Sequence, residues 1–408
     1  MRVNAKSKIN LAFGAIGVLF MLFAFVLLNQ ATRIKWHSNE IETNWLPGIV
    51  SINTIDSAMG EYRAAEIGHS LAKEDISKVE FNQKMVLLKE KVQAMKDKYE
   101  PTIRPTSEIE RALYQHFIKL YDQYMVASEQ VITLSKNYEQ EKAIKQITDN
   151  NGIYNDLLGY LQELVELNAR GGETEGQNGK NVFEFTKVQI IVGVSIISLA
   201  LIIGFTLSGG LHKHQDSEAS SRIKRNTFLA ILFLILLCAV YSGLIYQQLV
   251  KVDKQTQELS NKWLPSLVVI SDIRNKAINY RVTEFLTILA LSPDEKIQLK
   301  GTRKVLFEEI SNSLKKYSPM ISSDYERNIF EQFSQSYDEY TLISKKIAGF
   351  ADINETDKAL SESNQSVILY DDFINLLGDL LRFNERGGVT TSFRNNAVLD
   401  SIKVISLG

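Results

Sequence analysis

The chain of 408 residues has little of what enzymes and metalloproteins usually need. It contains one cysteine, Cys238, and five scattered histidines. A single cysteine excludes an internal disulfide and a thiolate metal cluster. His212 and His214 are the one close histidine pair, and positions i and i+2 point to different sides of a helix. The sequence also shows no nucleophile beside a base, no phosphate-binding loop and no carboxylates at metal spacing. We therefore expect no enzyme activity, no metal and no cofactor.

Proline is scarce, and neither sign of charge dominates. There are six prolines, where ordinary usage would give about twenty, so long helices are expected. Acidic and basic residues number 48 and 46. Without a basic field to hold a phosphate backbone, nucleic acid is not expected as a partner.

Three long runs are uncharged and apolar, namely residues 9–28, 188–207 and 228–246. About twenty residues in a helix match a hydrocarbon core of ~30 Å, so we predict transmembrane helices. The first run is too long for the core of a cleaved signal peptide, and we interpret it as an uncleaved anchor. Residues 404–408 resemble the start of the second run. We interpret them as the start of a truncated fourth transmembrane helix.

Basic residues predict the orientation in the membrane. They flank the apolar runs in residues 1–8 and in the short loop 208–227. The positive-inside rule places both segments in the cytoplasm. The long polar stretches 29–187 and 247–403 then lie outside. For a bacterial chain this predicts a multi-pass protein of the inner (cytoplasmic) membrane with a cytoplasmic N-terminus and two periplasmic domains.

The chain is an internal duplication. Trp45-Leu46-Pro47 recurs 218 residues later (265 − 47) as Trp263-Leu264-Pro265. Beyond the middle of each domain the shift is 216 residues (384 − 168), where Asn168-Ala169-Arg170-Gly171-Gly172 pairs with Asn384-Glu385-Arg386-Gly387-Gly388. Each repeat is one span, one polar domain and a second span. A repeat of this kind must be recognised before a fold is assigned.

Each polar domain is predicted to hold four helices. In the first helix of each domain, mostly apolar residues recur at alternating spacings of 3 and 4, which is a coiled-coil pattern. We expect two copies of the protein to pack through this seam. Prolines between residues 101 and 105, and Pro319, separate the second helix from the third. We place the third turns at Asn137 and at residues 349–352. The fold class is therefore all-α and integral to the membrane, with two tandem extracytoplasmic four-helix up-and-down bundles, each leaving a transmembrane helix.

These residues resemble a known family. A Leu-Pro near the start of a long helix leaving a first span, an Arg some sixteen residues later, and an Asn with small residues before a second span resemble the four-helix-bundle sensor domain of methyl-accepting chemotaxis proteins. The resemblance implies an extracytoplasmic, usually dimeric, ligand-sensing bundle that moves its second span. The expected ligand is a small anion or an amino acid.

The chain departs from that family after its second span, where a linker and a methylated coiled coil would follow. It holds twenty residues there and then another span. Contact with the chemotaxis kinase complex would therefore need an output domain missing from this chain. Two other hypotheses remain open. One is a non-sensing membrane scaffold, and the other is the input half of a sensor histidine kinase or a diguanylate cyclase.

Two arginine-glutamate pairs, Arg63 with Glu66 and Arg281 with Glu284, occupy equivalent positions in the repeats. The first interpretation is an i,i+3 ion pair that fixes helix register, because a charge in a seam must be paired. The second is a ligand site, in which the planar Arg fork clamps a small carboxylate.

Proline and glycine define a further layer. Counted at ~1.5 Å per residue from the membrane, Pro47 and Gly171 lie at roughly the same height, as do Pro265 and Gly387. We predict a hinge there, because proline removes a helix hydrogen bond and glycine loosens its neighbour. Asn168 and Asn384 lie on the last seam of each repeat, where a lone Asn usually sets register.

Overall fold

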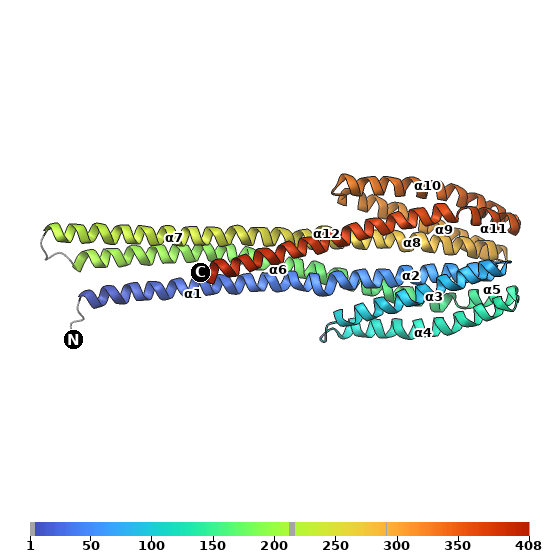
Figure 1. Cartoon of the computed structure of the whole chain (residues 1–408), viewed down its shortest axis with the longest axis horizontal. Helices are drawn as coiled ribbons and strands as arrows, with labels where there is room; N and C mark the ends of the chain where they lie inside the picture. The colour runs from blue at the N-terminus through green and yellow to red at the C-terminus, as the bar shows by residue number, and fades with distance from the viewer. Residues whose placement is uncertain (1–4, 212–216, 291, 408) are drawn as a thin grey trace. The chain divides into compact units, whose positions relative to one another are not determined.

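The computed structural model describes residues 5–211, 217–290 and 292–407, and every regular element in these ranges is a helix (Figure 1). The expected all-α fold is confirmed. His212 and His214 lie outside the described residues. The chain forms two compact units. We call residues 42–173 and 260–389 the bundle unit, and residues 1–41, 174–259 and 390–408 the apolar unit.

The first repeat begins with a long helix that changes its winding. Helix α1 (Ala5–Glu40) passes through a π-helical segment, η1 (Ile41–Trp45), into α2 (Leu46–Leu71). Pro47 has no N–H to donate and clashes with the carbonyl four residues earlier, which explains the wider winding just before it. The remaining elements are α3 (Asp75–Tyr99), η2 (Glu100–Thr102), α4 (Glu108–Lys136), α5 (Gln140–Asp149) and α6 (Asn151–Leu211).

The second repeat has the same order of elements. They are α7 (Ser217–Glu258), the π-helical η3 (Leu259–Trp263), α8 (Leu264–Leu289), α9 (Pro293–Tyr317), η4 (Ser318–Met320), α10 (Asp324–Asp352), α11 (Thr356–Gln365) and α12 (Val367–Leu407). In each repeat the fourth helix of the bundle is broken once, at Asn150 or at Ser366. The prediction of four helices in each bundle is therefore confirmed, provided that α5–α6 and α11–α12 are each counted as one interrupted helix.

Turn and capping residues in the sequence place several helix ends. Ser292 caps α9 by accepting a hydrogen bond from the Glu295 backbone N–H, with Pro293 following, as an N-cap and N1 proline should. The third turn of repeat one follows α4 at Asn137, as predicted. In repeat two α10 continues through residues 349–352, so that prediction lay a few residues early. The turns use left-handed residues, Tyr138 and Asn354.

The predicted seam of the first helix is buried inside its own bundle. Ile52, Ile55, Met59 and Tyr62 belong to one core with residues of α3, α4 and α6, including Leu88, Phe117 and Leu161. The same holds for Ile270, Ile273 and Tyr280 in repeat two. The expectation that this seam joins two copies of the protein was therefore wrong. A four-helix bundle needs that stripe for its own core.

A second stripe on the same helices joins the repeats. Helices α2 and α8 lie side by side (Figure 1). Ser57 donates a hydrogen bond to Asn275 at 2.8 Å, and Gly60 lies so close to Ile278 that a Cβ there would overlap it. Residues 57 and 275, and 60 and 278, are equivalent positions of the duplication. This second stripe, and not the predicted seam, forms the contact between the two repeats of the chain.

The apolar unit has the character of a membrane domain. Three helices in the described ranges are long and apolar enough to cross a bilayer, and each overlaps one of the three predicted runs. Its core includes Leu27, Ile197 and Cys238, while large apolar side chains such as Met21 and Phe233 are exposed. Such exposure suits lipid, not water. The chain is a membrane protein.

Candidate ligand site between the two repeats

A cavity of about 180 Å³ lies between the repeats within the bundle unit. Repeat one lines it with residues of α2 and α3, and repeat two with residues of α8 and α12. The lining residues are Ile49, Val50, Asn53, Thr54, Lys91, Leu267, Ser271, Arg274, Gly378, Leu381, Arg382 and Glu385. The volume is below the ~300 Å³ of sites for drug-sized molecules, so it suits a small metabolite.

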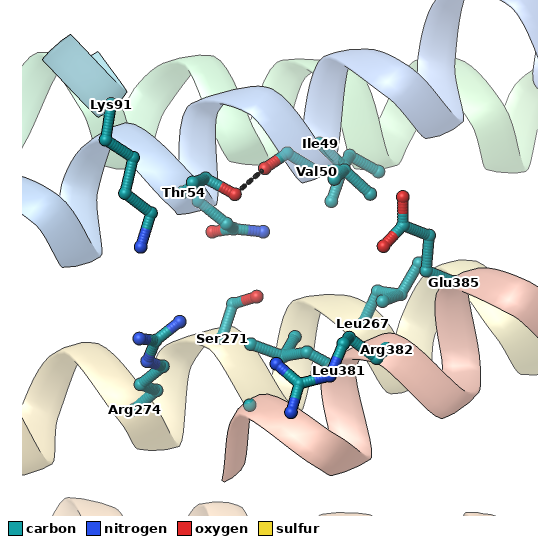
Figure 2. Close-up of a pocket in the computed structure, with 12 residues that line it drawn as sticks. Ile49, Val50, Thr54, Lys91, Leu267, Ser271, Arg274, Leu381, Arg382 and Glu385 are labelled. Atoms are coloured by element: carbon teal, nitrogen blue, oxygen red, sulfur yellow. Dashed lines mark hydrogen bonds between the residues drawn. The ribbon is translucent and has the colours of Figure 1, made fainter. Parts of the chain in front are cut away.

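Three cations and one carboxylate line this cavity. Lys91 and Arg274 face each other across one end, and Glu385 lies at the other (Figure 2). Arg274 pairs with Glu61 at 3.0 Å, and both are largely buried. Burial lowers the pKa of Lys91, Glu61 raises it and the neighbouring Arg274 lowers it. Lys91 and Arg274 are thus partly desolvated, which strengthens their attraction for an anion, whereas Arg382 is exposed and pairs with Asp379.

Several polar atoms at the cavity are buried and unpartnered. They are Asn53 Nδ2, Ser271 Oγ and Arg274 Nε. Buried polar groups in folded proteins are nearly always hydrogen-bonded. Two of these three atoms are donors and the third is a hydroxyl that can donate. The cavity therefore offers hydrogen-bond donors as well as positive charge, which is the chemistry that recognises a carboxylate.

The Arg63 pair predicted from the sequence lies elsewhere, inside bundle one. Arg63 and Glu66 are fully buried and pair at 2.8 Å. The other Arg63 amino group donates to the Ile147 carbonyl at 2.6 Å and to Asn151 at 2.5 Å. Burial alone would lower the pKa of Arg63, but Tyr124 and Glu66 beside it raise it. Ile147 is in the last turn of α5, so Arg63 caps that helix where the chain bends into α6.

The second pair repeats this arrangement. Arg281 donates to Glu284 at 2.5 Å, and also to the Ser363 carbonyl at the end of α11. Ser366 at the helix break accepts a further hydrogen bond. This geometry is that of the register interpretation. Ligand binding by either arginine stays a prediction, and neither arginine lines the cavity between the repeats.

Asn168 and Asn384 belong to a duplicated hydrogen-bond network. Asn168 donates to Tyr99 Oη at 3.1 Å, and Tyr99 donates to Glu110 at 2.9 Å. In repeat two Asn384 and Glu326 meet Tyr317 in the same way. The network ties the second, third and fourth helices together. The sequence singled out the two asparagines but did not predict that tyrosines and glutamates would join them in a network, although these four residues also recur at equivalent positions.

The predicted proline-glycine layer is brought together by tryptophan. A Cβ added to Gly171 would overlap the ring of Trp45, and one added to Gly387 would overlap that of Trp263. Each tryptophan ends a π-helical segment, just before Pro47 or Pro265. A Cβ on Gly48 would overlap the Asn168 amide in the same layer. Trp45 thus lies against Gly171, and Gly48 against Asn168, while a hinge at this layer stays a prediction.

Comparison with known proteins identifies the family. The model of the four-helix-bundle sensory module for signal transduction matches twice, over residues 2–183 and 221–399. The chain belongs to this family. It is also similar to a Bacillus subtilis protein named "Putative sensory transducer protein YvaQ", at 27% identity over 200 residues. That match covers 48% of this chain and 35% of the relative, so the chain spans about a third of it. No solved structure matched the chain.

The cavity residues were not among those that the sequence singled out as a candidate site. Lys91, Arg274 and Arg382 lie on exposed or half-buried stripes of three different helices, and nothing in their spacing joins them. A signal was nevertheless available. Aligning the two repeats shows that these cations differ from their equivalents, whereas the buried network residues do not.

Proposed function

We propose that this chain is the ligand-sensing input module of a transmembrane receptor of the methyl-accepting chemotaxis type. The two bundles lie outside the cytoplasmic membrane, in the periplasm of a bacterium with two membranes. A small anionic ligand, either a carboxylate or an amino acid, binds in the cavity between the repeats. Its binding is transmitted through the membrane helices. An output domain supplies the contact with a chemotaxis kinase complex.

The observation that carries this proposal is the cavity itself. It combines Lys91 and Arg274 with buried donors that have no protein partner. A scaffold gains nothing from such groups, because an unsatisfied buried donor costs roughly 1–3 kcal/mol. A sensor gains from them, because a ligand that satisfies them stabilises one arrangement of the two repeats. Glu385 at the far end would pair with the ammonium of an amino acid.

The family membership supports sensing, and it is shared by receptors with different outputs. The alternative input roles, in a sensor histidine kinase or a diguanylate cyclase, would use the same cavity and the same membrane helices. A homodimer would then form through surfaces other than the α2–α8 contact, because the repeats occupy that contact within one chain.

A thermal-shift screen tests the proposal on the full chain in detergent micelles or nanodiscs. The panel is malonate, succinate, L-glutamate, L-serine and, as a cation, putrescine. A ligand at a hundred times its dissociation constant adds ~2.7 kcal/mol to the folded state. We expect stabilisation by at least one anion or amino acid, and loss of it in Lys91→Gln and Arg274→Gln.

The matched control is Lys145→Gln, which removes one exposed cation of α5 that does not line the cavity. It should leave the response unchanged. If no member of the panel stabilises the protein, or if Lys145→Gln weakens the response as much as Lys91→Gln does, the ligand-sensing proposal is wrong and the scaffold hypothesis gains support.

A further inference from the structure

The two bundles are related by an approximate two-fold axis between α2 and α8. Gly172 lies against Leu264, and Gly388 lies against Leu46. In the duplication, Gly388 is the equivalent of Gly172, and Leu264 is the equivalent of Leu46. Reciprocal contacts of this kind define a two-fold interface. Every residue that lines the cavity therefore has an equivalent on the opposite side of the axis, and together these equivalents make a second, symmetry-related position.

The three cations change sign between the two positions, and the one carboxylate, Glu385, corresponds to the neutral Ala169. Lys91 of the cavity corresponds to Glu309, Arg274 corresponds to Asp56, and Arg382 corresponds to Glu166. All three cations of the cavity are thus replaced by acids. Thr54, which is neutral, corresponds to a further acid, Asp272. An anion attracted to the first position would be repelled from the second.

A lysine inside the protein neutralises the acidic position. Lys276 Nζ lies 2.8 Å from Asp272 and 3.6 Å from Glu309. Ser313 donates to the same oxygen of Asp272 at 2.7 Å, and Asn275 donates to Asp56. The equivalent of Lys276 in repeat one is Ala58, a residue that leaves room and adds no charge. Asp272 and Glu309 are partly exposed, and Lys276 is their counter-ion within the chain.

We propose that the chain has one anion site instead of the two that its two-fold symmetry would allow, and that Lys276 is the built-in counter-ion of the second position. This rests on the proposed function, and it adds both a stoichiometry and a charge selectivity to it. The ligand is a small carboxylate that occupies only the Lys91–Arg274 side. The opposite side keeps a counter-ion within the chain, so the ligand occupies one side of the two-fold axis and not the other.

The experiment uses the full chain in nanodiscs, with malonate and L-glutamate as anion probes and putrescine as a cation probe. The apparent dissociation constant comes from the concentration dependence of the melting temperature. Lys91→Gln should weaken the binding of a responding anion about tenfold or more, as expected for loss of a charged hydrogen-bond partner. Its matched control, Glu309→Gln at the equivalent position, should leave that binding within twofold.

The gain-of-function variant is Lys276→Ala, which copies the residue at position 58. It leaves Asp272 and Glu309 without their counter-ion, and we expect putrescine to raise the melting temperature of the variant while leaving the wild type unchanged. Because Lys276→Ala could lower expression, Lys276→Gln serves as a second variant that keeps the side-chain length.

The outcomes separate the two proposals. If Glu309→Gln or Asp56→Asn weakens the anion response as much as Lys91→Gln does, or if the folded Lys276 variants gain no response to putrescine, the one-site inference is overturned. If the wild type responds to no anion of the panel while a Lys276 variant gains putrescine binding, the proposed function fails and the role of Lys276 as a counter-ion stands.

Discussion

The ring of Trp45 occupies the space in which a side chain at position 171 would begin, so Gly171 is required for the contact between α1–α2 and α6. Trp263 and Gly387 make the same contact in the second repeat. Both glycines sit in helices without unusual backbone angles. Close approach of a large ring is therefore their physical reason, and it can be tested by adding a single methyl group.

Gly171→Ala should destabilise the protein by about 1–3 kcal/mol, as overpacking usually does. Gly159→Ala is the matched control, because it lies in the same helix with open space around its Cβ position. That substitution should be neutral or stabilising by up to ~1 kcal/mol, since alanine favours a helix. Chemical denaturation followed by circular dichroism measures both. Equal stability of the two variants would show that the Trp45 contact is not formed.

Arg63→Met should cost about 3–5 kcal/mol, because it leaves the buried Glu66 carboxylate without its partner. Arg63→Lys keeps the charge but cannot serve Glu66, Ile147 and Asn151 together, since those three contacts use both amino groups of the fork. We expect it to lower stability by a smaller amount. Its apparent ligand affinity should match the wild type, because Arg63 does not line the cavity.

The ligand affinity of Arg63→Lys distinguishes the two interpretations of this ion pair, a register role and a ligand site. Suppose that a ligand stabilises the wild type but no longer binds the Arg63→Lys variant, and that the variant without ligand is only slightly less stable than the wild type. That result would support ligand binding by Arg63 and contradict the register role. Arg281→Lys provides the same comparison in repeat two.

Asp56 should make stability fall as the pH rises. Burial, together with the nearby Asp272 carboxylate, raises the pKa of Asp56 from 3.8 to about 7. Between these values the folded protein holds a proton that the unfolded chain has released. The contribution of Asp56 to the free energy of unfolding is therefore fully present below the pKa that Asp56 has in the unfolded chain, and it is lost as the pH rises to about 7. Asp56→Asn resembles the protonated form, and it should be more stable than the wild type by about 1–3 kcal/mol at pH 8.

His69 makes stability depend on pH in the opposite direction, over part of the same pH range. Burial, then Lys78 and Lys136, lowers its pKa from 6.5 to about 4, so its contribution is present above the unfolded pKa and is lost as the pH falls toward 4. The comparison must therefore be between Asp56→Asn and the wild type at each pH. Parallel stability curves for the two proteins from pH 5 to 8 would contradict the raised pKa of Asp56.

The proposed topology is tested with single cysteines in a Cys238→Ala background. Gly349→Cys is suitable because its Cβ position is open, and Ser220→Cys marks the short basic loop. In intact cells a membrane-impermeant maleimide should label the first and not the second, since the basic residues favour the cytoplasm. Labelling of Ser220→Cys alone would invert the topology and remove the sensing proposal.

Much of this protein was determined by the sequence alone. Long uncharged runs predict membrane helices because a bilayer core has a set thickness. The duplication, the all-helical class and the Ser292 cap follow from local residue patterns, because capping and proline effects act within a few residues. The asparagines and glycines of the last helix were found because they recur in both repeats.

Only the tertiary structure decided which side of each first helix faces which partner. One helix carries two buried stripes, and periodicity cannot tell whether Ile52 or Ser57 faces the other repeat. The cavity likewise joins Lys91, Arg274 and Glu385 from three helices far apart in the chain. The change of sign from Lys91 to Glu309 is visible in the sequence, but its meaning depends on the two-fold axis. That axis exists because both repeats bury one stripe in their own cores and the other against each other.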